Sequence, residues 1–298
     1  MRRCGVWLIS CVACIGPLSA QTNASAPPAW QKAAGGAMAF EVASVREDKG
    51  PFKPPSFALS IDASFPDPNG RFHADFALPI YIEFAYKVSL TGDERKAMLA
   101  NLPGWVGTDR FEIQATAPLH ATKDQYRSMM QALLAERFGL KLHFEEKEMP
   151  VLVMTFAKPG KPGPKLIPHA QGQACDETPK PETFPKDCYI FMAMPGKDRT
   201  IIFGSRAVSM AEISNFVGSF GAFSEEIGRR VVDRTGVSGL WDFSLQAAQP
   251  TRNPSPEESV EGPNMLEALR EQLGIKLIST RAAVSLPVVD HVERPTAN

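Results

Sequence analysis

The chain has 298 residues, of which 44% are apolar and 22% are charged, and its 32 basic side chains nearly balance its 33 acidic ones. Intrinsically disordered chains are poorer in apolar residues, so this composition excludes that class. Nucleic-acid-binding proteins usually carry a basic excess, which is missing here. A chain of this length can bury one large hydrophobic core or two ordinary ones.

The first 20 residues have the layout of a secretory signal peptide. Arg2 and Arg3 form a short basic region, residues 6–15 are apolar, and a run of small residues ends at Ala20. The apolar run is too short to span a bilayer. A lipid anchor is not favoured, because processing at Cys11 would leave a very short apolar region. We therefore predict an exported protein, located in the periplasm or outside the cell.

Removal of this segment leaves a mildly acidic chain, with 30 basic residues against 33 acidic ones. No later segment approaches 18 consecutive apolar residues, so we expect a soluble mature chain without a transmembrane segment. The charge balance predicts no nucleic-acid partner and no strong attraction to anionic membranes.

Two cysteines, Cys175 and Cys188, remain after the signal peptide. In an oxidising compartment, an even pair is most simply explained by one disulfide that closes a small loop. Two free thiols and a metal site are the alternatives. The metal alternative lacks a second ligand pair at suitable spacing, and we expect neither a metal nor a cofactor.

The mature chain divides into two parts of similar size. Residues 21–38 are small and polar, which predicts a flexible leader, and a first α+β part follows at 39–158. A proline-rich connector at 159–198 contains both cysteines, and a second α+β part covers 199–298.

The two parts resemble each other in sequence. At an offset of 132 residues, Gly104, Gly107, Phe111, Gln114, Ala115 and Pro118 match Gly236, Gly239, Phe243, Gln246, Ala247 and Pro250. At an offset of 135, Met130, Leu134, Glu136, Gly139, Lys141 and Leu142 match Met265, Leu269, Glu271, Gly274, Lys276 and Leu277. Because the order is preserved, we predict a duplicated unit of about 90 residues.

In the first part, residues 40–45 and 71–74 are predicted strands, and 49–70 form a long loop with five prolines. Pro79 opens a helix, and a strand follows at 111–117. A second helix is capped at Thr122 and stopped by Gly139. Strands are expected at 140–144 and 151–156, with a solvated turn of charged residues between them.

The second part repeats this pattern. A strand at 200–204 precedes a helix with a Ser209–Glu212 capping box, and a strand at 243–248 precedes a helix that begins at Asn264 and stops at Gly274. Two strands, 275–278 and 286–292, close the chain. We predict an α+β fold of two related strand-helix-strand-helix-strand-strand copies, with mainly antiparallel or mixed sheets.

Five segments together resemble one known family: FEVASVRED, LLAERFGLKLHFEEKEMPVLVM, VVDRTGVSGLWDF, EALREQLGIKL and VVDHVERPTAN. This is an exported domain-of-unknown-function family expanded in soil bacteria of the acidobacterial type, and the resemblance extends from Phe40 to the C-terminus. It implies no assigned activity and therefore no catalytic residues. Similar domains attached to membrane-bound sensor peptidases hint at recognition. Residues 90–102 depart from the family by being more helical and charged.

Sequence motifs for catalysis are missing. The five histidines form no HExxH or HxH pair, and the chain has no GxSxG elbow, P-loop or GxGxxG. Asp109, Asp233 and Asp242 could converge into an acidic hydrolase site if the two copies pack about a pseudo-twofold axis. The alternative is that each aspartate caps its own turn by accepting backbone N–H hydrogen bonds.

Aromatic side chains give the remaining signal. Phe52, Phe57, Phe65, Phe184 and Phe223 lie in predicted loops. Together with tryptophans they could line a groove for a partner, or they could fill gaps beneath the loops. Our binding candidates are Trp105, Phe223 and Trp241. We predict a non-catalytic binding module of the cell envelope with a protein or glycan partner, and a periplasmic hydrolase as the alternative.

Overall fold

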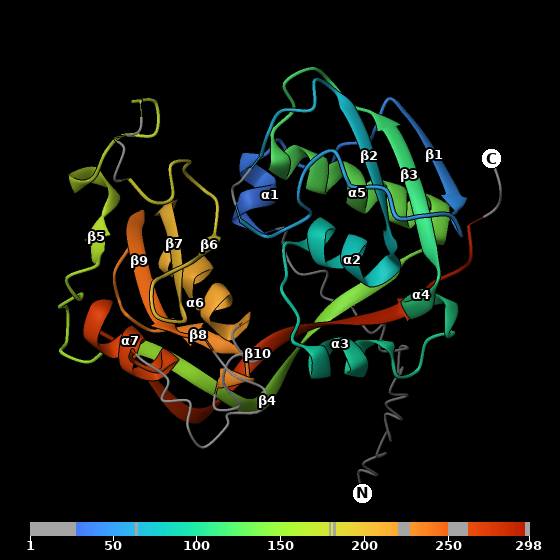
Figure 1. The fold of residues 1–298 in the computed structure, drawn as a ribbon. Helices are drawn as coiled ribbons and strands as arrows, with labels where there is room; N and C mark the ends of the chain where they lie inside the picture. Colours follow the sequence, from blue (N-terminus) through green and yellow to red (C-terminus); the bar gives the residue numbers. More distant parts are fainter. Residues whose placement is uncertain are drawn as a thin grey trace, which may run out of the picture.

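The computed structural model of the protein describes residues 28–62, 65–178, 180, 183–219, 227–249 and 262–295. Figure 1 shows two lobes, each built from a sheet and helices, and a long two-stranded ribbon that runs along both. The predicted α+β class with antiparallel and mixed sheets is confirmed. The predicted signal peptide and the first residues of the predicted leader lie outside the described residues.

The first lobe contains an antiparallel three-stranded sheet in the order β1-β3-β2. Its strands are β1 (Val42–Glu47), β2 (Arg71–Ala77) and β3 (Arg110–Thr116). Two helices pack together against it, α2 (Leu78–Tyr86) and α5 (Lys123–Phe138). Shorter helices complete the lobe: α1 (Ala29–Ala33), α3 (Gly92–Leu99) and α4 (Trp105–Thr108).

The second lobe contains an antiparallel four-stranded sheet in the order β5-β9-β7-β6. Its strands are β5 (Leu166–Pro168), β9 (Trp241–Ala248), β7 (Thr200–Val208) and β6 (Met192–Pro195). The helices of this lobe are α6 (Met210–Gly218), α7 (Met265–Gln272) and the 3-10 helix η1 (His169–Gln171). The proline-rich connector thus supplies both outer strands, β5 and β6.

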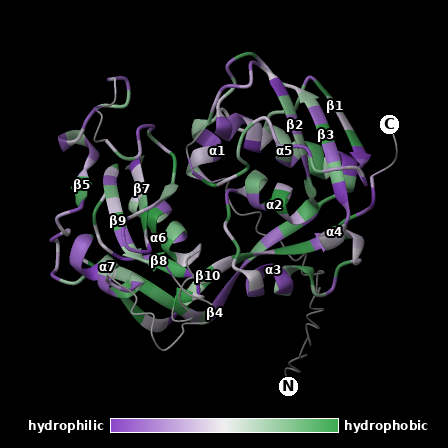
Figure 2. Cartoon of the chain, viewed as in Figure 1, coloured by the Kyte–Doolittle hydropathy of each residue, from purple (hydrophilic) through white to green (hydrophobic). Residues whose placement is uncertain are grey.

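The ribbon pairs β4 (Lys141–Phe156) with β10 (Ile275–His291), antiparallel along almost their whole length. The short strand β8 (Val231–Asp233) adds in parallel beside β4. Each end of the ribbon enters the core of one lobe: Val151 and Val284 belong to the first core, Met154 and Ile275 to the second. Figure 2 shows the hydrophobic residues of α2 and α6 gathered inside the lobes.

The predicted turn at 145–148 is wrong, because β4 runs through it without a break. The two predicted closing strands at 275–278 and 286–292 form one continuous strand, β10. Glu145, Glu146 and Glu148 are exposed residues of β4, although Leu286, which pairs with Glu145 on β10, belongs to the first core. Because successive side chains of a strand point to opposite faces, a strand whose own side chains all meet water can carry consecutive charged residues. The charged run therefore marks an uncovered strand and no turn.

The predicted helix starts are confirmed. Thr122, Ser209 and Asn264 each form a capping box, in which the side chain accepts from the third helical N–H and the residue at that position accepts from the cap. The segment expected to be unusually helical contains α3, which begins with the same device at Thr91. Among the described residues, no helix is long and apolar enough to cross a bilayer.

Candidate functional site

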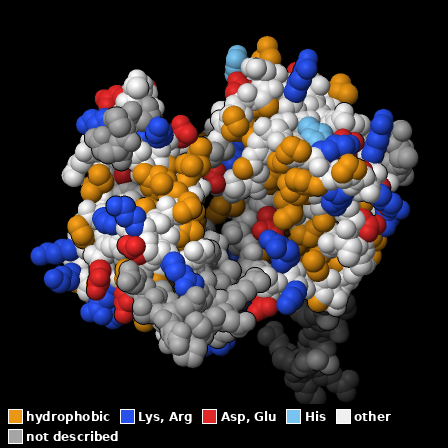
Figure 3. Space-filling model, in the orientation of Figure 1, with side chains coloured by type: hydrophobic (Ala, Val, Ile, Leu, Met, Phe, Trp, Pro, Cys, Tyr) orange, Lys and Arg blue, Asp and Glu red, His pale blue; other side chains and the backbone are white. Residues whose placement is uncertain are grey.

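Two adjoining cavities of about 300 and 270 Å³ lie between the lobes. Ser89 and Asn215 line both, so we treat the two as one cleft, called the interlobe cleft. The loop after α2 forms one wall, and α6 forms the other. Figure 3 shows the hollow between the lobes, with hydrophobic side chains gathered on the side of the second lobe that faces it.

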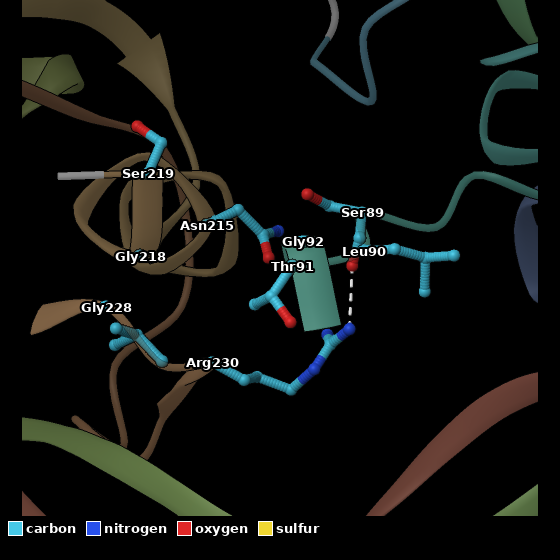
Figure 4. A pocket seen from close by; sticks show the side chains of 10 residues that line it. Ser89, Leu90, Thr91, Gly92, Asn215, Gly218, Ser219, Gly228 and Arg230 are labelled. Carbon is cyan, nitrogen blue, oxygen red and sulfur yellow. Dashed lines mark hydrogen bonds between the residues drawn. The ribbon is translucent and has the colours of Figure 1, made fainter. Parts of the chain in front are cut away.

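The first cavity is lined mainly by uncharged polar groups. Figure 4 shows Asn215 pointing from α6 toward Ser89, while the guanidinium of Arg230 reaches the same loop. Glycines stand on both walls, and Gly92 and Gly218 leave the backbone close to the cavity surface. These hydroxyl, amide and backbone groups can donate hydrogen bonds to a neutral polar ligand and accept hydrogen bonds from it.

An ion pair between Glu94 and Arg230 fixes one wall of the first cavity. Arg230 Nε donates to Glu94 Oε1 at 2.7 Å, and its Nη2 donates to Glu94 Oε2 at 2.6 Å and to the Ser89 carbonyl at 2.7 Å. Burial of Glu94 works to raise the pKa of its carboxyl, but hydrogen bonds from Arg230 and Thr91 outweigh it, and the pKa lies below its ordinary value. The pair is therefore charged at neutral pH and holds the loop after α2 against the segment before β8.

The second cavity is more apolar. Phe191 and Phe216 pack together with their ring centroids 4.6 Å apart and their planes tilted by 32°. They line this cavity together with the loop at residues 59–62 of the first lobe. Three carboxylates also line this cavity, and each has a partner. Glu83 pairs with Arg95, Glu212 belongs to the capping box of α6, and Asp62 pairs with Lys123.

Buried cations on α5 hold the loop at residues 59–62. Arg127, with 2% of its side chain exposed, donates to the carbonyls of Ser60 and Asp62 at 2.9 and 3.2 Å and lies 5.4 Å from the ring centre of Phe84. Lys123 donates to the Ser60 hydroxyl at 3.0 Å. Burial lowers the pKa of both cations, and the acidic groups beside them oppose that shift. The loop at residues 59–62, which lines the cleft, is thus held in place by side chains of the first lobe itself.

The three aspartates predicted from sequence have separate partners. Asp109 accepts from Thr108 and, at 2.6 Å, from Arg294. Asp233 accepts from the N–H and hydroxyl of Thr235 at 2.9 and 2.7 Å. Asp242 contacts His169 Nδ1 at 2.7 Å and accepts from the Ala207 N–H at 2.9 Å. None of these partners is shared between two of the aspartates.

Two of the aromatic binding candidates, Trp105 and Trp241, do not line the cleft. Trp105 packs edge-on against Phe111 and has the guanidinium of Arg294 5.2 Å from its ring centre. Trp241 is 6% exposed and belongs to the second core. Phe223 lies outside the described residues. Among the loop aromatics, Phe57 is buried beneath its loop, as the gap-filling alternative expects.

Sequence reasoning missed the cleft aromatics Phe191 and Phe216. Phe216 belongs to the apolar stripe of α6, where helical spacing predicts a core position. Phe191 follows the second cysteine in the connector. The one sequence feature that could have indicated a surface role for Phe191 is the short apolar segment MAMP that follows it at 192–195, which forms the exposed strand β6.

Cys175 and Cys188 form a disulfide with Cα atoms 5.8 Å apart, which confirms the predicted pairing. The ligand atoms of His169 and the two cysteines all lie within 4.8 Å of one another. Sequence spacing did not suggest this third residue. His169 reaches the cysteines because η1 turns the chain back beside β9.

Comparison with known proteins gives one match. Residues 80–292 match a family described as "Protein of unknown function (DUF3738)". No curated protein and no solved structure matches the chain. The family match covers most of the chain and both lobes, and it agrees with the expected resemblance to a family without an assigned activity. The chain belongs to the DUF3738 family of proteins of unknown function.

Proposed function

We propose that this protein is a non-catalytic binding module of the cell envelope and that the interlobe cleft is its binding site. The observation that carries the proposal is the cleft itself, which both lobes line and whose charged groups are paired within the protein. Concave sites with an apolar part and a few convergent polar groups are the usual form of ligand sites. We infer that the ligand is an extended peptide segment of an envelope protein.

The composition of the cleft supports a peptide ligand. Phe191 and Phe216 offer an apolar surface for a side chain, and the polar groups around Asn215 offer partners for a peptide backbone. The ion pair of Glu94 and Arg230 is satisfied without a ligand, so no strongly charged ligand is required.

A free strand edge beside the cleft supports the same ligand. Phe191 directly precedes β6, which pairs only with β7 among the described strands. The N–H of Gly196 donates to the carbonyl of Thr200 on the β7 side. In an antiparallel pair, every second residue directs its N–H and C=O toward the partner strand. Counting back from Gly196, the N–H and C=O of Ala193 therefore point away from β7. An added peptide strand could pair with this edge, which is a common mode of peptide recognition.

The order of elements supports a duplicated origin for the two lobes. When the additional elements α3, α4 and β8 are left out, the order β2-α2-β3-α5-β4 in the first half corresponds to β7-α6-β9-α7-β10 in the second. Duplication would place equivalent elements on the two walls of one cleft. The disulfide fits an exported protein, because such bonds persist in oxidising compartments.

A periplasmic hydrolase that uses Asp109, Asp233 and Asp242 is the alternative. Asp233 accepts hydrogen bonds within its own turn, whereas Asp109 and Asp242 bind residues that are distant in sequence, Arg294 and His169. Each of the three carboxylates has separate partners, which does not support a shared acidic site. We therefore develop the binding proposal alone.

The test is a display library of random peptides selected against the purified protein, with a glycan array in parallel. The Asn215→Trp variant fills the cleft from α6, and Ala135→Trp on the exposed face of α5 is the matched control. We expect selected peptides to lose about tenfold or more in affinity for Asn215→Trp and to bind Ala135→Trp normally. Peptides that bind both variants equally would contradict the cleft as the site. Ligands found only on the glycan array would contradict the peptide assignment.

A further inference from the structure

A cluster of metal-ligating side chains lies in the second lobe, in the connector rather than the interlobe cleft. The Nε2 atom of His169 is 3.4 Å from the Sγ atom of Cys175, and both cysteine sulfurs lie within 4.8 Å of that nitrogen. Cys175 is exposed, and Cys188 and His169 are half-buried. Solvent reagents can therefore reach the cluster.

Asp242 sets the orientation of His169. The Nδ1 atom of His169 lies 2.7 Å from Asp242 Oδ1, which also accepts the N–H of Ala207 at 2.9 Å. A proton on Nδ1 leaves a lone pair on Nε2, directed at the cysteines. A Cβ on Gly172 would lie 2.4 Å from Asp242 Oδ2, so glycine is needed for this close approach. Carboxylate–histidine pairs of this kind orient the histidines that bind zinc.

Arg206 holds the two cysteine-bearing segments independently of the disulfide. Its side chain is 5% exposed, and it donates to the carbonyl of Gln173, two residues before Cys175. It also donates at 2.8 Å to the carbonyl of Lys186, two residues before Cys188. Because one buried cation on β7 ties both segments, the cysteines stay close together when the disulfide is opened.

We propose that the reduced form of this cluster is a zinc site, with His169 Nε2 and the Sγ atoms of Cys175 and Cys188 as ligands. Zinc binds thiolate and imidazole in tetrahedral sites, with Zn–S and Zn–N bonds of about 2.3 and 2.0 Å, which requires ligand separations of about 3.5–3.8 Å. Rotation of two cysteine side chains whose Cα atoms are 5.8 Å apart can provide this separation. Three protein ligands leave the fourth position open to water or a further ligand.

The zinc site can form only after the disulfide between Cys175 and Cys188 has been reduced. A dithiol reductant gives two electrons and two protons to the disulfide, and the reductant becomes a disulfide itself. Zn²⁺ then displaces both thiol protons and binds the two thiolates, while neutral His169 contributes its lone pair. In the oxidised protein, Cys175 and Cys188 are bonded to each other and offer no thiolate. The same residues are therefore either a disulfide or a zinc site.

Zinc titration of the chain with Cys4, Cys11 and Cys14 changed to serine, under a non-metal-binding reductant, tests the proposal. A chromophoric chelator serves as competitor, and Co²⁺ absorption is a second readout. The matched control is His120→Ala, because His120 Nδ1 also lies 2.7 Å from a carboxylate, that of Asp67. We expect the reduced protein and this control to bind one zinc each. Thiolate-to-cobalt charge-transfer absorption should appear in both, and the oxidised protein should show neither signal.

His169→Ala should weaken zinc binding by more than tenfold, because it removes a ligand. Asp242→Asn should weaken it by about 10–100-fold, the usual effect of removing the carboxylate that hydrogen-bonds a metal-binding histidine. Circular dichroism of each reduced variant checks its folding. If His169→Ala fails to fold, His169→Cys replaces it and should retain zinc with stronger charge-transfer absorption. Equal zinc affinity with and without His169, or no zinc binding by the folded reduced protein, would overturn the proposal.

Discussion

At the level of single residues, Arg230 is expected to contribute strongly to stability. Its partner Glu94 has only 2% of its side chain exposed, so removal of the guanidinium leaves a buried carboxylate without its counter-ion. We expect Arg230→Ala to lower the free energy of unfolding by about 3–5 kcal/mol. Urea denaturation measures this change. The neighbouring Arg229 bonds an exposed serine, so Arg229→Ala should change it by about 0.5 kcal/mol or less, and equal effects of the two variants would contradict the account.

The same ion pair predicts a pH dependence of stability. The pKa of Glu94 is lower in the folded protein than its ordinary value of 4.5, so folding favours the charged carboxylate. Its contribution to the free energy of unfolding is present above the unfolded pKa and is lost as the pH falls through the folded pKa. The stability difference between the wild type and Glu94→Gln should therefore shrink as the pH falls below about 4.5. A constant difference between pH 7 and pH 3 would contradict the assigned charge state.

The glycines that follow two of the helices, Gly139 after α5 and Gly274 after α7, differ in how closely other segments pack against them. Both follow a helix with positive φ, 57° and 69°. A Cβ on Gly274 would lie 2.6 Å from the backbone nitrogen of Gly163, whereas the nearest atom at Gly139 would be 3.5 Å away. We expect Gly139→Ala to cost about 1–2 kcal/mol for its backbone conformation, and Gly274→Ala to cost more. Thermal unfolding compares the two variants, and equal melting temperatures would contradict the close packing at Gly163.

Local signals explain which elements could be predicted from sequence. The caps at Thr122, Ser209 and Asn264 depend on residues three positions apart, so the sequence contains all the information needed. The continuity of β4 and β10 depends on which part of a strand is covered by a core. Charged residues such as Glu145 are compatible with a turn or an uncovered strand, and only the assembled lobes decide between them.

At the scale of the whole molecule, the candidate sites depend on segments that are distant in sequence. The disulfide could be predicted because only two cysteines follow the predicted signal peptide. His169 and Asp242 are 73 positions apart and meet only when η1 lies against β9. The cleft likewise joins Ser89 to Asn215 across two lobes. No pattern in the sequence predicted that His169 contacts Asp242 or that Ser89 and Asn215 line the same cleft.

The central claim is that the interlobe cleft binds a peptide between both lobes. Hydrogen exchange of the protein, measured with and without a saturating peptide from the display selection, tests it most directly. We expect slower exchange at the amides of residues 89–92 in the first lobe and 215–219 in the second, and at the amide of Ala193 on the edge of β6. Protection confined to one lobe, or found on the β1-β3-β2 sheet while the cleft amides are unchanged, would contradict it.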